Sequence, residues 1–170
     1  MPEPLAVQVI ERLTERGLSL ATAEASVGGM IGHWLTDVPG ASRVFVGGIA
    51  AYGNQPKLDL LHVSPEVMQN HGAVSELTVS EMAEGARDAM GTDLGVAESG
   101  ITSPNDNPER PGGLFYIAVV GPGLERVERH LFSGSREEIK RQATEAVLRL
   151  VLDYLDGSTP SEPAGGGAAR

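Results

Sequence analysis

The chain of 170 residues contains no cysteine, and aromatic residues make up only 4% of it. The absence of cysteine excludes disulfide bonds and catalysis by a thiol. With so few aromatic side chains, the core must be built from Val, Leu, Ile and Ala. No apolar run approaches the ~20 residues of a membrane-spanning helix, and no signal peptide is visible. We therefore expect a cytoplasmic protein that does not bind membranes.

Positive charge is also scarce, because 13 Lys and Arg face 23 Asp and Glu and give a formal net charge of -10. A nucleic-acid surface requires clustered Lys and Arg, so this balance argues against a DNA or RNA partner. The four histidines are scattered and never form an H-x-x-x-H pair, so we expect no metal site. Lysine occurs only twice, at Lys57 and Lys140.

Hydrophobic periodicity and turn residues predict an α/β fold in which helices alternate with buried strands. Helices are expected at Pro4–Arg16, Met30–Leu35, Glu76–Met90 and Arg136–Leu155, with helical turns at Lys57–Leu61 and after Ser64. Strands are expected at Leu18–Ala23, Arg43–Ala51, Leu94–Ala97, Leu114–Val120 and Arg126–Phe132. These elements predict a three-layer α/β/α sandwich with a mixed, mostly parallel sheet of about five strands and a late antiparallel hairpin.

The length of the chain fits one domain, which we place at residues 1–156. Residues 157–170 consist mainly of Gly, Pro, Ser and Ala, a composition typical of a disordered tail. A long polar loop is expected from Glu98 to Arg110. Its length favours a functional role, because unstructured connections beyond roughly 12 residues are uncommon in compact domains.

Three turns carry side chains or backbone groups suited to chemistry. The first turn, Glu24–Gly29 (E-A-S-V-G-G), follows the first predicted strand. It presents Ser26 at a helix N-terminus, where the N–H groups of Gly28 and Gly29 could hold an oxyanion or a phosphate. The alternative is that Ser26 only caps the helix and the glycines only permit close packing.

The second turn, Tyr52–Lys57 (Y-G-N-Q-P-K), follows the second predicted strand. A serine hydroxyl is a poor nucleophile until a base removes its proton. Lys57 can be that base if burial lowers its pKa enough to keep the amine neutral, and Tyr52 can orient the proton. The alternative is an ordinary surface lysine at the start of a helix.

The third turn begins with the sequence S-G-I-T-S-P at Ser99. Its hydroxyl groups, which include those of Ser99 and Thr102 on either side of Gly100, could bind a ribose or a phosphate. The alternative is a mobile surface loop. In a parallel sheet these three turns would meet at one edge, where α/β enzymes usually bind small ligands.

Motifs distributed along residues 5 to 155 resemble the CinA C-terminal domain family, the competence/damage-inducible proteins. They are A-E-x-x-x-G-G, L-T-D-V-P-G-A-S, F-x-G-G-I-x-x-Y-x-N-x-x-K, G-A-V-S-E and S-G-I-x-x-P, in the family's order. The resemblance implies an α/β/α domain that converts nicotinamide mononucleotide to nicotinate mononucleotide and ammonia, without metal or other cofactor. It implies a serine nucleophile in the first turn, assisted by Lys57 and Tyr52, with Asn54 also matching the family pattern.

Departures from the family pattern fall in the expected pocket. The family's A-E-S-C-T-G-G reads A-E-A-S-V-G-G here, so Ala25 stands at the serine position and Ser26 at the neighbouring cysteine position. The family's T-G-I-A-G-P has become S-G-I-T-S-P, preceded by Glu98 where an apolar residue is usual. The glycines that normally follow are replaced by Asn105-Asp106-Asn107. Added carboxylates would repel a phosphate.

The leading functional hypothesis is an amidohydrolase of pyridine-nucleotide salvage with Ser26 as nucleophile and Lys57 and Tyr52 as catalytic partners. The substrate, a small nucleotide, would contact a set of residues from the three turns: Glu24, Gly28, Gly29, Asn54, Ser99, Gly100 and Thr102. One alternative is a catalytically silent family member that binds a nucleotide or a protein partner, because Ala25 lacks the family hydroxyl. Another is an amidase for a less phosphorylated substrate. We expect a homo-oligomer, since such pockets often lie near subunit contacts.

Overall fold

The computed structural model describes residues 1–157, so the predicted tail lies outside the described residues except for Gly157. The strands are β1 (Leu20–Glu24), β2 (Phe45–Ala50), β3 (Leu94–Gly100), β4 (Leu114–Gly121) and β5 (Leu124–Leu131). The helices are α1 (Pro4–Arg16), α2 (Met30–Thr36), α3 (Asn54–Asp59), α4 (Pro65–His71), α5 (Glu76–Met90) and α6 (Arg136–Asp156), with a 3₁₀ turn at Ala41–Arg43.

The five strands form one mixed sheet in the order β2-β1-β3-β4-β5. Strand β1 pairs in parallel with β2 and with β3, whereas β4 pairs antiparallel with β3 and with β5. Four strands therefore run in one direction and only β4 opposes them, as the sequence predicted. The carboxyl ends of β1, β2 and β3 meet at one edge of the sheet, and each end leads into one of the three polar turns.

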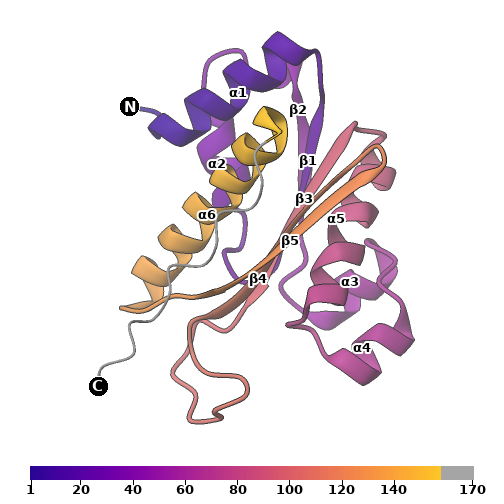
Figure 1. The fold of residues 1–170 in the computed structure, drawn as a ribbon, viewed down its shortest axis with the longest axis vertical. Helices are drawn as coiled ribbons and strands as arrows, with labels where there is room; N and C mark the ends of the chain where they lie inside the picture. Colours follow the sequence, from indigo (N-terminus) through magenta and orange to yellow (C-terminus); the bar gives the residue numbers. More distant parts are fainter. Residues whose placement is uncertain (158–170) are drawn as a thin grey trace.

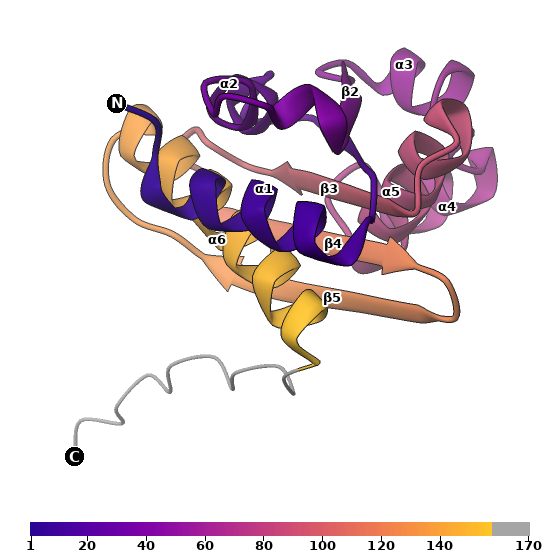
Figure 2. The same cartoon turned by 90° about the horizontal axis from the view of Figure 1, so that it is seen from above.

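Helices cover both faces of the sheet and complete the predicted three layers. Figures 1 and 2 show α1, α2 and α6 on one face and α3, α4 and α5 on the other. The face under α1, α2 and α6 is lined by large apolar side chains such as Leu20, Val96 and Phe115. Apolar residues of the sheet and the helices thus form a continuous core on that side.

The opposite face of the sheet is made of small residues, chiefly alanines, which let α5 approach the strands closely. Gly85 in the middle of α5 illustrates how close the packing is. A Cβ built on Gly85 would lie 2.0 Å from the carbonyl oxygen of Leu61. Only glycine fits at this point of the helix, because the neighbouring atom belongs to the backbone and cannot rotate away.

One predicted boundary is wrong in a way that matters for the site. The sequence placed Glu98 in a polar loop, but β3 continues to Gly100 and Glu98 is completely buried within it. The loop therefore begins at Ile101. Backbone pairing explains the difference, since Glu98 lies between Glu24 on β1 and Ile117 on β4 in the sheet register. The polar side chain of Glu98 suggested an exposed loop, but β3 pairs with β1 on one side and β4 on the other, and this pairing buries the residue.

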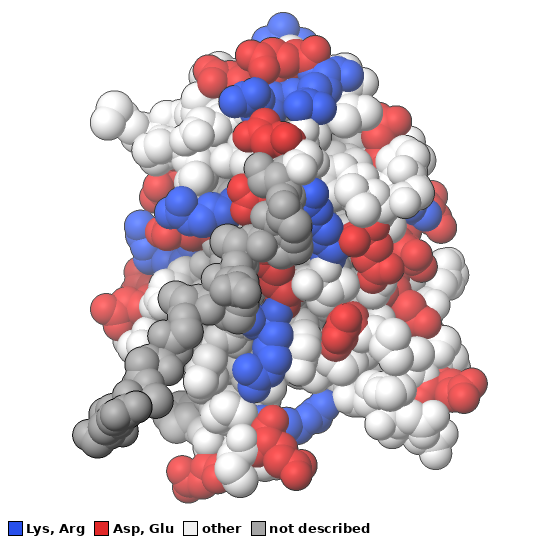
Figure 3. All heavy atoms as spheres, viewed as in Figure 1, with Lys and Arg blue, Asp and Glu red and all other residues white. Residues whose placement is uncertain are grey.

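Within residues 1–157, no helix combines the length and apolar character required to cross a membrane. The face in Figure 3 carries Asp and Glu side chains interspersed with Lys and Arg, and the described atoms show no broad basic area there. The absence of a nucleic-acid partner stays a prediction from the charge balance.

Replacing Gly85 by alanine is predicted to destabilise the protein. In most helix interiors this change stabilises by about 0.5–1 kcal/mol, but here the new methyl group meets the Leu61 carbonyl. We expect the free energy of unfolding, measured in urea, to fall by about 1–3 kcal/mol. Gly32→Ala in α2 is the matched control, because its Cβ would have only ordinary contacts, the nearest at 3.4 Å. Equal effects of the two changes would contradict this account of α5 packing.

Candidate functional site

A hollow of about 280 Å³ lies at the sheet edge where β1, β2 and β3 end. It gathers most of the residues that the sequence singled out: Ser26, Tyr52, Asn54, Lys57, Ser99, Gly100 and Thr102, together with Ala25, Ala73 and Val74. The three turns therefore converge, as parallel pairing required. We call this hollow the edge pocket.

Lys57 is the most unusual residue of the edge pocket, because only 2% of it is exposed to solvent. Its ammonium donates hydrogen bonds to the carbonyl oxygens of Ala51 at 2.9 Å and Gly53 at 3.1 Å. An ammonium has three donors, so one remains for a ligand, and no third partner lies within residues 1–157. Burial lowers the pKa of Lys57, while the negative charge of Glu98 opposes this shift. Lys57 is thus not an ordinary surface lysine.

Ser26 lines the edge pocket, but its hydroxyl is already engaged. The Oγ atom donates to the carbonyl oxygen of Gly100 at 2.6 Å and accepts from the Gly100 N–H at 2.9 Å. This pair of bonds fastens the turn after β1 to the end of β3. In the described residues Ser26 makes no hydrogen bond with Lys57, so attack by Ser26 requires its hydroxyl to turn from Gly100 toward the amine. Its role as nucleophile stays a prediction.

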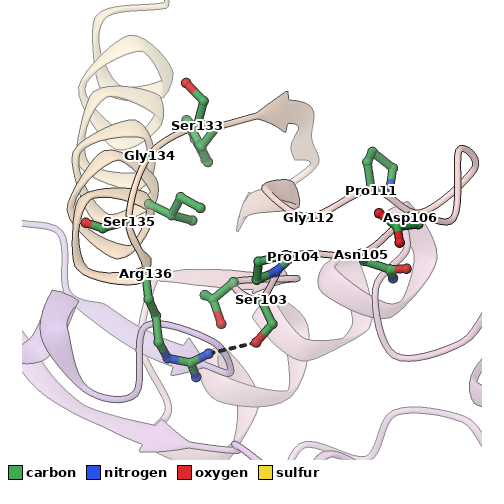
Figure 4. Close-up of a pocket in the computed structure, with 13 residues that line it drawn as sticks. Ser103, Pro104, Asn105, Asp106, Pro111, Gly112, Ser133, Gly134, Ser135 and Arg136 are labelled. Atoms are coloured by element: carbon green, nitrogen blue, oxygen red, sulfur yellow. Dashed lines mark hydrogen bonds between the residues drawn. The ribbon is translucent and has the colours of Figure 1, made fainter.

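Tyr52 connects the edge pocket to a second, larger hollow of about 550 Å³. The Tyr52 hydroxyl accepts a hydrogen bond at 3.1 Å from Arg136, the first residue of α6. The same guanidinium donates to Ser103 at 3.2 Å, the contact drawn as a dashed line in Figure 4. Thr102 lines both hollows, so the two adjoin.

The larger hollow lies between the loop after β3 and the start of α6 (Figure 4). Its lining combines hydroxyl groups, such as that of Ser135, with the cation of Arg136 and the carboxyl group of Asp106. The Ser135 hydroxyl caps α6 by accepting the Glu138 N–H at 3.3 Å. A ligand that extends from the edge pocket therefore meets both signs of charge.

The remaining wall of the edge pocket is fixed by Ser99 and Arg110. The buried Ser99 donates to the carbonyl oxygen of Ala73 at 2.7 Å. Arg110 donates to His71 and to Val74, at 2.7 and 3.1 Å. The polar loop after β3 and the turn between α4 and α5 are thereby joined. The sequence does not reveal the roles of Arg110 and Arg136, because each arginine donates to groups far away along the chain.

Glu24 and the two glycines of the first turn lie apart from the residues that line the edge pocket. The buried Glu24 carboxylate accepts from the N–H groups of Gly29 and Ile31, both at 2.9 Å, and of Gly32, also at 2.9 Å. Glu24 therefore serves as the N-terminal cap of α2, where a negative charge is favoured by the helix dipole. The Gly29 N–H is used in this cap, and the predicted substrate contacts of Glu24, Gly28 and Gly29 stay predictions.

Glu98 is the second buried carboxyl group at this edge. Its Oε1 accepts the Val27 N–H at 3.0 Å, whereas Oε2 has no hydrogen-bond partner in the described part of the chain. Burial raises the pKa of Glu98 to about 7, and the nearby Glu24 adds to the rise, although N–H groups of the first turn oppose it. A carboxyl group that can change charge near neutral pH therefore lies beside the turn of Ser26.

The raised pKa of Glu98 predicts a pH-dependent stability. Between about pH 4.5 and pH 7, the folded protein keeps the Glu98 carboxyl group protonated more strongly than the unfolded chain does. The free energy of unfolding therefore falls as pH rises through that range. The loss amounts to roughly 3 kcal/mol at 1.4 kcal/mol per pH unit. We expect Glu98→Gln, which stays uncharged, to exceed the parent protein in urea stability at pH 8 and to match it near pH 4.5. If the two proteins differed in stability by the same amount at pH 8 and at pH 4.5, Glu98 would not be the group with the raised pKa.

Comparison with known proteins places these residues in a family. The CinA C-terminal domain family matches residues 2–155. A CinA-like protein of Syntrophotalea carbinolica is 44% identical over 154 residues, which cover 90% of this chain and 37% of that protein. A putative competence-damage inducible protein of Moorella thermoacetica is 43% identical over 144 residues, covering 84% of this chain and 35% of the relative. The chain thus spans just over a third of each relative's length.

Solved structures agree with the fold. A CinA superfamily protein from Klebsiella pneumoniae has a TM-score of 0.86 at 28% identity, and the match covers 90% of this chain and 96% of that one. A competence/damage-inducible protein from Agrobacterium tumefaciens has a TM-score of 0.82 at 33% identity, with 89% and 93% covered. On the family match and these identities, the chain belongs to the CinA C-terminal domain family.

Proposed function

We propose that this protein is an amidohydrolase of the CinA C-terminal domain family that removes ammonia from the carboxamide of nicotinamide mononucleotide. One observation carries the proposal: the buried Lys57 opens into a hollow that also holds Ser26, Tyr52 and Asn54. A desolvated amine beside a hydroxyl is the arrangement that activates a serine for acyl transfer. The resemblance noted from the sequence supplies the substrate.

The proposed reaction has two halves. The Ser26 hydroxyl leaves Gly100, passes its proton to the neutral amine of Lys57, and attacks the carboxamide carbon. The carbon–nitrogen bond then breaks, and ammonia leaves with the proton that Lys57 returns. A water molecule, activated by the same amine, hydrolyses the resulting ester to nicotinate mononucleotide and frees Ser26.

The larger hollow, which adjoins the edge pocket, would accommodate the ribose and the phosphate of the nucleotide. The carboxamide would occupy the edge pocket, and the ribose phosphate would extend past Thr102 toward Arg136. A guanidinium at that position attracts a phosphate, whereas Asp106 in the same hollow repels it. The balance between these two charges decides whether nicotinamide mononucleotide or its riboside is the better substrate, so both belong in the assay.

A second candidate function is supported by the position of Ala25. Ala25 stands at the family's serine position and lines the edge pocket, so no hydroxyl is present there. The Ser26 hydroxyl is hydrogen-bonded to Gly100. A nucleotide-binding protein without turnover would keep the pocket and lose the nucleophile. Thermal stabilisation by nicotinamide mononucleotide without ammonia release would favour this reading over the amidohydrolase.

Ammonia release from nicotinamide mononucleotide tests the proposal directly. We expect activity in the parent protein and a loss of about 10²–10⁴-fold in Lys57→Met, the range for removal of a general base. Lys140→Met, which changes the only other lysine, is the matched control and should keep full activity. Equal activity of the parent and Lys57→Met would contradict the proposed base.

Two further variants separate the candidate nucleophiles. Ser26→Ala should abolish turnover if Ser26 attacks the carboxamide, and its melting temperature shows whether loss of the Gly100 bonds has also loosened the fold. Ala25→Ser restores the family hydroxyl on the pocket wall. Turnover that appears only in Ala25→Ser would support the silent binder, and full activity in a folded Ser26→Ala variant would remove Ser26 from the mechanism.

A further inference from the structure

The proposed reaction requires hydrogen-bond donors for the oxyanion that forms when the carboxamide is attacked. In the first turn, the Val27 N–H already donates to Glu98 at 3.0 Å. The Gly29 N–H donates to Glu24 at 2.9 Å, and Gly28 does not line the edge pocket. A segment of the pocket wall with unused N–H groups is better placed to supply the donors.

The segment between α4 and α5 has such N–H groups. It contributes Ala73 and Val74 to the lining of the edge pocket. Both residues are half-buried, and neither of their N–H groups has an acceptor within residues 1–157. A backbone donor at the wall of a hollow that bonds no protein group is available to a ligand.

Arg110 holds the two ends of this segment. Its Nη2 atom donates to the carbonyl oxygens of His71 at 2.7 Å and of Val74 at 3.1 Å. The guanidinium also lies against Gly72, where a Cβ would come within 2.7 Å of Nη2 and 2.9 Å of Nη1. Glycine at this position, with a φ of +77°, therefore lets the arginine approach the backbone closely.

The two carbonyl groups between these ends are held as well. Thr78, in the first turn of α5, donates to Gly72 at 2.7 Å, and Ser99, at the end of β3, donates to Ala73 at 2.7 Å. A trans peptide unit points its N–H opposite to its C=O, and the described chain has no cis peptide bond. The Ala73 N–H therefore points away from Thr78, and the Val74 N–H points away from Ser99.

We propose that the N–H groups of Ala73 and Val74 donate to the carboxamide oxygen and stabilise the oxyanion, and that Arg110 is the positioning residue that holds them. The identity of this oxygen rests on the proposed function. The buried Lys57 lines the same hollow, and its third donor has no partner in the described residues. It points independently to a ligand that accepts hydrogen bonds or carries negative charge.

Amide proton resonances test these donors without any substitution. In ¹⁵N-labelled protein, the amide protons of Ala73 and Val74 should move downfield when nicotinate mononucleotide binds, because the product carboxylate replaces the carboxamide oxygen. The Gly29 amide is the internal control and should move less, since it already has an acceptor. Shifts at Tyr52 and Asn54 without shifts at Ala73 and Val74 would overturn the inference and leave the proposed function standing.

Acetate separates a failure of the donors from a failure of the function. If nicotinate mononucleotide shifts no resonance of the edge pocket, the proposed function is wrong, and acetate then tests the N–H groups as a carboxylate probe. Saturable downfield shifts of both amide protons with acetate would support the donors. Their absence from the acetate titration would overturn the inference.

Arg110→Met tests the positioning role by kinetics. We expect kcat to fall by roughly 10²-fold, the effect of misplaced catalytic groups, with little change in KM, because the oxyanion is absent from the bound substrate. Arg129→Met, at an exposed position of β5, is the matched control and should keep the parent kcat. A rise in KM at unchanged kcat would overturn the inference. If Arg110→Met does not fold, the amide shifts of the parent protein decide.

Discussion

Burial of the Lys57 ammonium is the interaction on which the site depends. A buried cation is costly unless it is hydrogen-bonded, and here the carbonyl groups of Ala51 and Gly53 supply the bonds. Both carbonyls belong to the chain that leaves β2, so the same turn carries the lysine and satisfies it. The remaining donor of the ammonium has no protein partner in the described residues, which leaves it for a ligand.

Sheet topology brings the other components to this lysine. Because β1 pairs in parallel with both β2 and β3, their three carboxyl ends share one edge, and each following turn contributes to the edge pocket. The Glu24 cap fixes α2 directly behind the first turn, and the Ser26–Gly100 pair joins that turn to β3. These contacts make the pocket largely pre-formed, with its hydroxyl groups held by the backbone.

Two buried carboxyl groups lie at the same edge and differ in their partners. Glu24 accepts N–H groups from three residues of α2 and its preceding turn, and it serves the fold. Glu98 has one such donor, the Val27 N–H, and its second oxygen has no hydrogen-bond partner within residues 1–157. The environment of each side chain therefore separates a carboxylate whose oxygens are fully hydrogen-bonded from one whose pKa burial raises to about 7.

Local sequence signals account for most of the fold. The serines that begin α4 and α5, Ser64 and Ser75, and the glycine after α1 made these helices predictable, and an apolar stripe did the same for α6. The three turns were also predictable, since each follows a buried strand. The burial of Glu98 was not, because it depends on strands paired from both sides. The contacts of Arg110 and Arg136 join segments 36 and 84 residues apart, a separation at which sequence patterns carry no signal.

A crystal structure with nicotinate mononucleotide bound would show whether the buried Lys57 receives a ligand at the edge of the sheet. The account predicts the pyridine carboxylate in the edge pocket, within hydrogen-bonding distance of the Lys57 ammonium, and the phosphate beyond Thr102 near Arg136. A ligand bound elsewhere on the molecule, with Lys57 still contacting only Ala51 and Gly53, would contradict it.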